Sequence, residues 1–407
     1  MKKTISILLI FITLVLSSCS SWSIDEVSAP VSDTEAIVSG KEYLDEVDFA
    51  KEYRAYSETL YETDLKPAAG MLLFRLSNNG WLLSYDPLHD CASYFCFNPA
   101  CTHPLEGGCI AKTLSVSHLF TYYDGYFYFA YVPNTLEQNS EGGIARVSLD
   151  GTEMKVIYKM NCWNVAKLKA GGGYLFIQNG GQKGLDRYDL KIGEYVKLDQ
   201  GRDGTFYNGF IATEEGVILH SRPYVYFADH DLKNKTPLFD MSIVLYTGDK
   251  MYHFSSERAS DGETISAIHF YEYDMKTGAD RLFYTQKGSV GGVHCADEEY
   301  VYYSPKSNTG GMLYTTGGVL NRVNISTGES EKIFEDSRLE IEELYSIDGK
   351  LYVKMENTGS YKGWMPNRLQ GSGRPIFGKL VDEDNDGMYE FVPFKWDIKQ
   401  LGYPDEG

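Results

Sequence analysis

Positive charge is scarce in this sequence. Its 407 residues hold 38 Lys and Arg against 57 Asp and Glu, which gives a formal net charge of −19 at pH 7. Such a surface repels polyphosphate backbones and anionic lipid head groups. The composition therefore argues against nucleic acid as a partner and leaves cations, or neutral ligands that stack on aromatic rings.

Common catalytic motifs are also absent. The sequence has no Gly-x-Ser-x-Gly, no His-Glu-x-x-His, no P-loop and no dinucleotide-binding glycine pattern. Binding is therefore favoured over catalysis. The question of an enzyme stays open, because some hydrolases and lyases assemble their sites from scattered residues.

Long hydrophobic runs are missing as well. The one apolar stretch near the start, Ile5–Leu16, is shorter than the roughly 20 residues that span a membrane. Lysines precede it and Leu16-Ser17-Ser18-Cys19 follows, which is typical of an export signal with a bacterial lipobox. We expect residues 1–18 to be removed and Cys19 to carry the lipid that attaches the chain outside the cell membrane. An ordinary cleaved signal with a chance cysteine is the alternative.

Tyrosine, phenylalanine and glycine are plentiful, at 32, 20 and 40 residues. They occur in short aromatic strands joined by Asp-Gly or Gly-rich turns, as in the stretch from Leu119 to Ala130, and this pattern predicts β-hairpins. The second hairpin of each unit turns near residues 151, 193, 234, 278, 328 and 387, at intervals of 42, 41, 44, 50 and 59. Two hairpins in each repeat of this length are typical of β-propeller blades.

The fold class predicted is therefore all-β, a β-propeller over residues 68–399. A weaker unit, Gly70–Asp86, brings the blade count to seven, with six or eight as alternatives. A β-sandwich or barrel would not explain hairpins that arrive in pairs. Residues 19–67 are interpreted as a tether with room for a short helix, and 400–407 as a tail.

Loop lengths indicate a binding face. The hairpin turns of a four-stranded blade lie on one side of the ring, and the connections between its two hairpins lie on the other. Long middle connections are expected at Val132–Gly143, Ser255–Ser266, Ser304–Gly318 and Asn357–Pro375. Length variation on one face of a repeat fold marks a binding surface. The last loop carries three side chains suited to sugar or peptide contact: Tyr361, Trp364 and Arg368.

Four of the seven cysteines lie between residues 91 and 109. The set Cys96, Cys101, His103 and Cys109 would complete a structural Zn²⁺ site. The alternatives are two disulfides that also use Cys91, or a reactive thiol with His103 as its base. Cys162 and Cys295 are isolated and are interpreted as packing thiols.

The same segment carries a resemblance. Cys96-Phe-Asn-Pro99-Ala-Cys101-Thr-His103, continuing to Cys109-Ile-Ala111, resembles a Cys-x-x-Pro-x-Cys-x-His-x(n)-Cys motif of propeller-type lipoproteins of Firmicutes. The resemblance implies the propeller fold and the lipid anchor. Its three cysteines and one histidine favour a metal, whereas Cys91 is an addition that keeps the disulfides open. The family carries no settled activity.

A carboxylate loop occupies the last second-hairpin turn. Asp382, Asp384 and Asp386 alternate before Gly387, Glu390 stands at the ninth position, and Met388 would contribute its carbonyl. Alternating carboxylates followed by glycine suit a structural Ca²⁺ site, although Pro393 at the twelfth position rules out a complete EF-hand loop. An ordinary hairpin turn is the alternative.

Two functions from different classes follow. The first is a monomeric binding or scaffolding propeller for a glycan, a peptide or a protein. The second is a propeller glycoside hydrolase or polysaccharide lyase, which would need carboxylates converging on the centre of the ring at about 5–10 Å.

Overall fold

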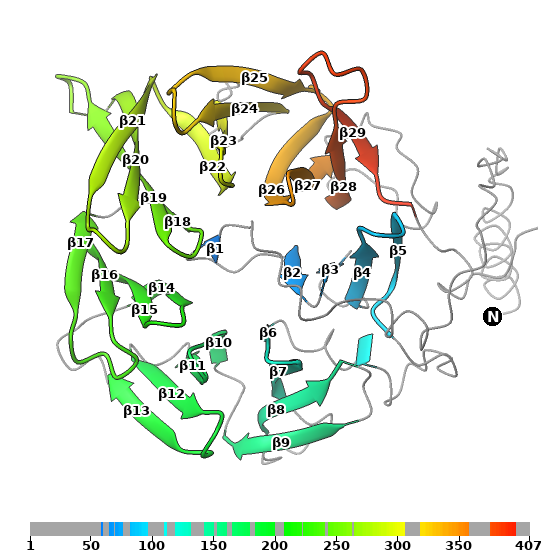
Figure 1. The fold of residues 1–407 in the computed structure, drawn as a ribbon, viewed down its shortest axis with the longest axis vertical. Coiled ribbons are helices and arrows are strands. Elements are labelled where there is room, and N and C mark those ends of the chain that lie inside the picture. Colours follow the sequence, from blue (N-terminus) through cyan, green and yellow to red (C-terminus); the bar gives the residue numbers. More distant parts are fainter. Residues whose placement is uncertain are drawn as a thin grey trace, which may run out of the picture. The chain divides into compact units, whose positions relative to one another are not determined.

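The computed structural model describes the chain over residues 58–59, 65–68, 70–75, 82–96, 110–111, 119–131, 142–149, 153–160, 165–179, 184–199, 207–221, 223–240, 243–262, 264–305, 318–357 and 375–395. These residues form seven antiparallel sheets around a common centre (Figure 1). The fold is an all-β, seven-bladed β-propeller, and the predicted count of seven is confirmed. Within these ranges, no helix has the length and hydropathy to cross a membrane.

The blades take their strands in chain order. Blade 1 holds β2 (Lys66–Ala68), β3 (Met71–Arg75), β4 (Leu82–Asp86) and β5 (Cys91–Tyr94). Blade 2 holds β6 (Phe120–Tyr123), β7 (Tyr126–Tyr131), β8 (Gly143–Ser148) and β9 (Met154–Lys159). Blade 3 holds β10 (Val165–Gly171), β11 (Tyr174–Asn179), β12 (Leu185–Asp189) and β13 (Tyr195–Asp199).

Blade 4 holds β14 (Tyr207–Ala212), β15 (Val217–Ser221), β16 (Tyr224–Ala228) and β17 (Thr236–Asp240). Blade 5 holds β18 (Ile243–Tyr246), β19 (Lys250–Arg258), β20 (Ile265–Asp274) and β21 (Asp280–Lys287), and β18 also pairs with the short strand β1 (Glu58–Thr59). Blade 6 holds β22 (Val290–Ala296), β23 (Tyr300–Pro305), β24 (Val319–Asn324) and β25 (Ser330–Glu335). Blade 7 holds β26 (Leu339–Ile347), β27 (Lys350–Asn357), β28 (Pro375–Val381) and β29 (Glu390–Pro393).

Burial falls from the second strand of a blade to the fourth. All five residues of β15 are buried, as are the four central residues of β7, β11 and β23. The fourth strands β9 and β17 have no buried residue. A strand packed on both faces reads as a continuous apolar run, which explains Phe127–Ala130 in the sequence.

The turns follow the predicted chemistry. Asp124 and Gly125 both have positive φ, at 48° and 79°, as the two-residue type I′ hairpin turn requires. The turn between the third and fourth strands is capped by a side chain: Asp274 Oδ1 accepts from the backbone N–H of Lys276 and Thr277 at 2.9 and 2.7 Å. Asp189 in blade 3 and Asn324 in blade 6 accept in the same way.

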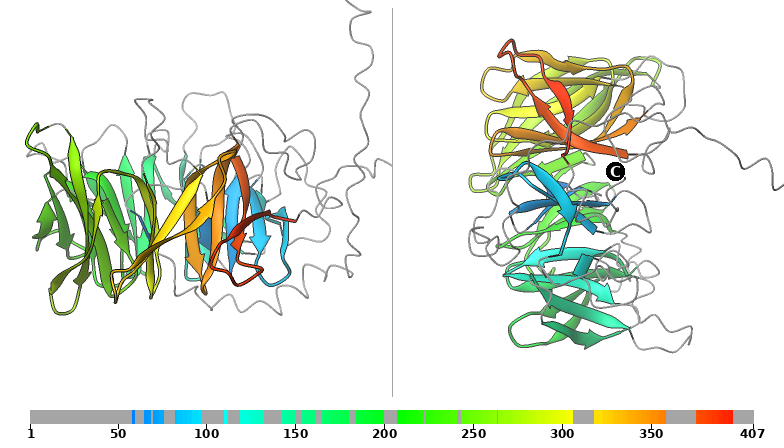
Figure 2. Two further views of the ribbon diagram at one scale, coloured as in Figure 1. Left: turned by 90° about the horizontal axis from the view of Figure 1, so that it is seen from above. Right: turned by 90° about the vertical axis from the view of Figure 1, so that its right-hand side faces the viewer.

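The ring has two different faces, which Figure 2 shows with the blades seen from the side. The turns after the first and third strands lie on one face, the short-turn face. The connections after the second and fourth strands lie on the other, the long-loop face. The predicted long loop at Ser255–Ser266 is wrong at both ends, because β19 continues to Arg258 and β20 begins at Ile265. The other three predicted long loops lie almost entirely outside the described residues.

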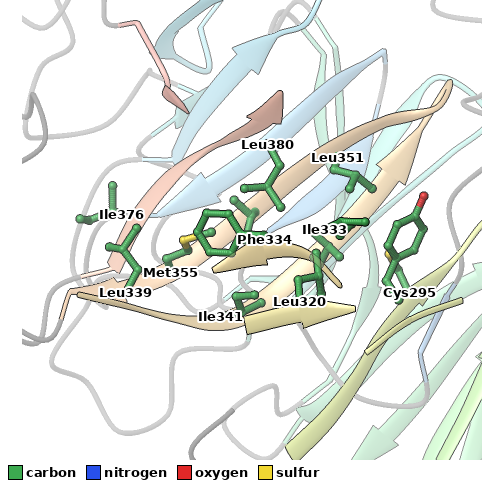
Figure 3. Packing of buried hydrophobic residues seen from close by; sticks show 13 residues of the cluster. Cys295, Leu320, Ile333, Phe334, Leu339, Ile341, Leu351, Met355, Ile376 and Leu380 are labelled. Atoms are coloured by element: carbon green, nitrogen blue, oxygen red, sulfur yellow. The ribbon is translucent and has the colours of Figure 1, made fainter. Parts of the chain in front are cut away.

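Hydrophobic clusters fill the spaces between neighbouring blades. One joins blades 6 and 7 through Cys295, Leu320, Phe334 and Met355, all at most 2% exposed (Figure 3). Cys295 is fully buried there, and burial raises the pKa of its thiol well above the ordinary value. The interpretation of Cys295 as a packing thiol is therefore confirmed.

The ring closes between blades 7 and 1 without an exchanged strand, since each blade takes its four strands from one continuous stretch. Aromatic packing replaces the exchange: Phe394, just after β29, stacks on Tyr85 of blade 1 with centroids 3.8 Å apart. Phe74 and Phe377 meet at 4.5 Å. One backbone hydrogen bond crosses the closure, from the N–H of Ala92 to the carbonyl of Lys395 at 2.6 Å.

A carboxylate completes this closure. Asp90 accepts from the Tyr85 hydroxyl at 2.6 Å and from Lys379 Nζ at 2.7 Å, and Lys395 Nζ lies 2.9 Å away. Burial alone would raise the pKa of Asp90, but hydrogen bonds from Lys379, Tyr85 and Lys395 outweigh it and lower the pKa to about 2. The charged carboxylate is therefore the form that holds the two end blades together.

Acid is expected to weaken the ring closure through Asp90. Its folded pKa of about 2 lies below the unfolded value of 3.8, so its contribution is complete above about pH 4 and is lost as the pH falls toward 2. With allowance for its partial exposure, we expect about 1–2 kcal/mol. Denaturant unfolding of the wild type and of Asp90→Asn should differ by this amount at pH 6 and converge near pH 2. A difference that stays constant across this range would contradict the assignment.

Candidate functional site

The centre of the ring is lined by the first strand of each blade. Figure 1 shows β6, β10, β14, β18, β22 and β26 turned toward the middle, with β1 beside β18. β1 pairs with β18 in antiparallel register, Glu58 opposite Tyr246 and Thr59 opposite Leu245. Blade 5 thus has five strands, and its inner edge is covered by a segment that precedes blade 1.

The other end of that segment is tied to blade 7. Leu65 is fully buried, and its backbone N–H donates to Glu343 Oε2 at 2.9 Å. Lys354 Nζ lies 2.7 Å from Glu342 and 3.6 Å from Glu343. We call the connection from Thr59 to Leu65 the cross-ring link. It joins the inner edge of blade 5 to blade 1, which are not neighbours in the ring.

Acidic and basic residues of the seven first strands lie on different strands. Among the residues assigned to the seven inner strands, Asp and Glu occur in β26 alone, as Glu340, Glu342 and Glu343. Lysines stand in β2 and β10, where Lys167 Nζ donates to the Asn208 carbonyl at 2.5 Å. The six other first strands carry no acid, and the remaining acid of the described inner strands is Glu58 of β1, on the inner edge of blade 5.

The predicted calcium loop is the blade 7 turn between β28 and β29. Asp382 accepts through Oδ1 from the N–H of Asp386 and through Oδ2 from the N–H of Gly387, both at 3.1 Å. Asp386 Oδ1 accepts from the N–H of Met388 at 2.8 Å. Asp382 thus closes a longer turn than Asp189, Asp274 and Asn324 do in other blades, since it accepts from the fourth and fifth residues after it and they accept from the second and third.

The remaining loop carboxylates do not gather in this turn. Asp384, Asp386 and Glu390 are exposed, and the described part of the chain contains no group of three His, Cys, Asp or Glu side chains placed to hold a metal. The calcium site at Asp382, Asp384, Asp386, Met388 and Glu390 stays a prediction.

The cysteine segment is described only at its start. Cys91 is the first residue of β5, at the short-turn face, whereas Cys96 follows the far end of that strand. The three strand steps from Cys91 to Tyr94 alone span roughly 10 Å, which exceeds the Cα separation of a disulfide. A bond between Cys91 and Cys96 is therefore excluded. Cys101, His103 and Cys109 lie outside the described residues.

The predicted anchor and the predicted binding side chains also lie outside the described residues: Cys19, Tyr361, Trp364 and Arg368. β1 and the start of blade 1 fall within residues 19–67, for which the sequence predicts a tether. The pairing of β1 was not foreseen, because two residues carry no periodic signal.

One polar trio on the long-loop side of blade 5 was also missed. His269 Nδ1 lies 3.0 Å from the Thr285 hydroxyl, and His269 Nε2 lies 3.3 Å from Glu257 Oε2. Hydroxyl, imidazole and carboxylate in this order can activate a nucleophile. Here Thr285 and Glu257 are exposed side chains on open strands, so the trio offers hydrogen-bonding groups at the surface and no water-excluding site.

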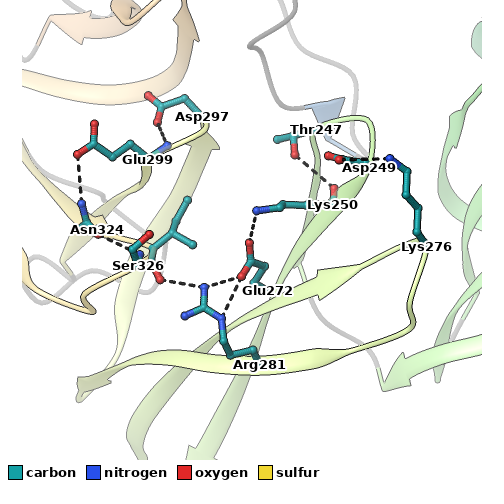
Figure 4. Close-up of polar contacts among 11 residues, drawn as sticks. Thr247, Asp249, Lys250, Glu272, Lys276, Arg281, Asp297, Glu299, Asn324 and Ser326 are labelled. Atoms are coloured by element: carbon teal, nitrogen blue, oxygen red, sulfur yellow. Dashed lines mark hydrogen bonds and ion pairs between the residues drawn. The ribbon is translucent and has the colours of Figure 1, made fainter.

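On the short-turn face, an ion-pair network within blade 5 is connected to blade 6 by a hydrogen bond. In blade 5, Glu272 accepts from Lys250 Nζ at 2.6 Å and from Arg281 Nε at 3.0 Å, and Arg281 also donates to the Ile325 carbonyl of blade 6 at 3.0 Å (Figure 4). Burial opposes the charge of Glu272, but Lys250 and Arg281 lower its pKa. Glu272 thus holds Arg281, which in turn contacts blade 6.

The fold and the ring centre define a seven-bladed β-propeller in which β1 covers the inner edge of blade 5. Its sequence matches no family model and no curated protein. Among solved structures it is similar to an oligogalacturonate lyase from Vibrio parahaemolyticus, at 13% identity over 75% of this chain and 88% of that one, with a TM-score of 0.45. It is also similar to the β-propeller domain of the Trilobed protease from Pyrococcus furiosus, at 12% identity over 68% and 83%, with a TM-score of 0.45. A chain of a nidogen/laminin complex matches at 12% identity over 58% and 93%, with a TM-score of 0.32.

Proposed function

We propose that this protein is a binding or scaffolding propeller, which recognises a glycan, a peptide or a protein through its long-loop face. The observation that carries the proposal is the cross-ring link. β1 covers the inner edge of blade 5, and Leu65 is bound to Glu343 of blade 7. Because the chain itself takes up this part of the ring centre, the loops around the long-loop face are the surface left for a ligand.

The charges of the inner strands support binding over the hydrolase or lyase alternative. Two carboxylates that flank a scissile glycosidic bond lie on opposite sides of it. Glu340, Glu342 and Glu343 belong to one strand, and Lys354 and Leu65 engage two of them. Among the described inner strands, the acid outside β26 is Glu58 of β1, which lies at the short-turn end of blade 5, away from the long-loop face.

The proposed location is outside the cell membrane, with the lipid on Cys19 as the attachment and the propeller as a monomer. The lipobox and the preceding apolar stretch support this part of the proposal. Stable membrane anchoring needs more than one acyl chain, and a diacylglycerol with a further acyl chain on Cys19 would provide this.

Zn²⁺ and Ca²⁺ are the proposed structural metals. The motif's three cysteines and one histidine support a set made of Cys96, Cys101, His103 and Cys109, and the exclusion of a Cys91–Cys96 disulfide removes one of the three connectivities of the alternative. Elemental analysis of the purified mature protein is expected to find one zinc per chain, and one calcium that a chelator removes. Asp382→Ala should abolish the calcium while leaving the zinc. An absence of both metals would leave disulfides in the cysteine segment and an ordinary turn at residues 382–390.

A glycan and peptide array tests the proposed function. We expect the mature protein to bind a limited class of these probes, and Trp364→Ala to weaken that binding about tenfold or more, since a stacked aromatic anchor commonly contributes over 1.4 kcal/mol. A substitution at the opposite face, Ile192→Ala, is the matched control and should leave binding unchanged; Ile192 is 68% exposed in a short turn. Release of shortened glycan products would instead support the enzyme. Binding to none of the probes would leave a protein as the remaining candidate for the partner.

A further inference from the structure

The direction of β1 determines the face from which the chain enters the ring. β18 runs toward the short-turn face, because residues 247–249 after it form the turn into β19. β1 is antiparallel to β18, with Glu58 opposite Tyr246 at the short-turn end and Thr59 opposite Leu245 further in. The chain therefore passes Glu58 from the short-turn side and travels toward the long-loop side.

The cross-ring link then reverses this direction. β2 runs toward the short-turn face, because it leads into the turn before β3. The six chain steps from Thr59 to Leu65 reach at most about 20 Å. The link is therefore short, and both of its ends are fixed to blades, one by strand pairing and the other by the hydrogen bond to Glu343.

We propose that the propeller is displayed with its short-turn face toward the membrane and its long-loop face away from it. The inference rests on the proposed function for the lipid at Cys19 and for the binding face. A tether that enters near the axis from the short-turn side pulls that face toward its anchored end. The long loops are then presented to glycans, peptides or proteins approaching from outside.

The composition of the short-turn face agrees with a surface that faces the membrane without inserting into it. Its described turns carry exposed charges, among them Asp249 at 58% and Lys276 at 77% exposure. Its exposed apolar side chains, such as Leu88 and Ile192, belong to different blades. The face would therefore approach lipid head groups on a tether, with the lipid chains as the only inserted part.

Energy transfer to the membrane surface tests the orientation. The lipid-modified full chain is reconstituted in phosphatidylcholine vesicles that carry an acceptor dye on the head groups. A donor dye is attached through a clickable noncanonical residue at position 276 on the short-turn face, or at position 260 on the long-loop face of the same blade. β20, which runs between these faces, has 10 residues and spans roughly 30 Å.

We expect clearly higher transfer from position 276 than from position 260. As a random coil the stretch from Cys19 to Glu58 would measure about 35 Å root mean square, so a deletion within it should increase the difference. Equal or reversed transfer would overturn the orientation. If the orientation fails while Trp364→Ala still weakens ligand binding, the proposed function stands; if the orientation holds and no ligand binds, the proposed function fails.

Discussion

Phe394→Ala is expected to lower the free energy of unfolding by about 3–5 kcal/mol, the usual cost of emptying a buried phenylalanine site. Phe394 is 1% exposed, stacks on Tyr85 at 3.8 Å and lies 5.6 Å from Phe74. It belongs to the hydrophobic cluster that joins blade 7 to blade 1. Denaturant unfolding of the purified mature protein, followed by fluorescence and circular dichroism, measures the loss.

The strands in which amide exchange accelerates distinguish a local defect at the ring closure from destabilisation of the whole ring. Because the ring has no exchanged strand, amide exchange in Phe394→Ala should accelerate most in β5 and β29 and least in β14–β17. Leu88→Ala in blade 1, the blade against which Phe394 packs, is the control; its side chain is 70% exposed, and the change should stay within about 0.5 kcal/mol. Undisturbed protection of β5 in Phe394→Ala would show that the ring closes by other contacts.

Asp297→Ala is expected to cost about 2–4 kcal/mol, although the residue is not in the hydrophobic core. Asp297 Oδ2 accepts from the hydroxyls of Tyr302 at 2.9 Å and Ser346 at 2.8 Å, and these side chains are 3% and 0% exposed. Oδ1 accepts from the N–H of Glu299 and Tyr300. Alanine leaves two buried hydroxyls without this acceptor, at about 1–3 kcal/mol each, and releases the contact between blades 6 and 7.

Blade 5 provides the matched control for Asp297. Asp249 lies in the equivalent first turn, is 58% exposed and reaches only as close as 3.7 Å to Lys276 (Figure 4). Asp249→Ala should therefore change the unfolding free energy by less than about 0.5 kcal/mol. Asp297→Asn keeps one acceptor oxygen and should recover part of the loss. Equal effects of Asp249→Ala and Asp297→Ala would contradict the buried-acceptor account.

The repeat could be predicted from sequence because local chemistry determines each hairpin. Asp124-Gly125 and Asp348-Gly349 specify turns with positive φ, and the aromatic run Phe127–Ala130 specifies a strand buried on both faces. These signals recur in phase with the blades, so the blade number and the two faces of the ring could both be inferred.

The site could be predicted less well, because its contacts are not local. The pairing of Glu58 with Tyr246 and the bond from Leu65 to Glu343 join residues far apart in the chain. Hydropathy likewise could not show that β19 extends to residue 258, since its last three residues, Ser256, Glu257 and Arg258, are exposed and polar. The sequence also groups Cys91 with the three cysteines that follow it, whereas in the structure it is the first residue of β5.

The four main strands of every blade follow one another along the chain, and this order affects how such a protein can change during evolution. A propeller closed by strand exchange must keep its first and last units together, whereas here a unit could be duplicated or lost without splitting a four-stranded sheet. The cross-ring link sets a limit on this freedom. It joins blade 5 to blade 1 with a fixed number of residues, so a unit gained or lost anywhere in the ring would change the separation of these two blades and would require the link to be rebuilt.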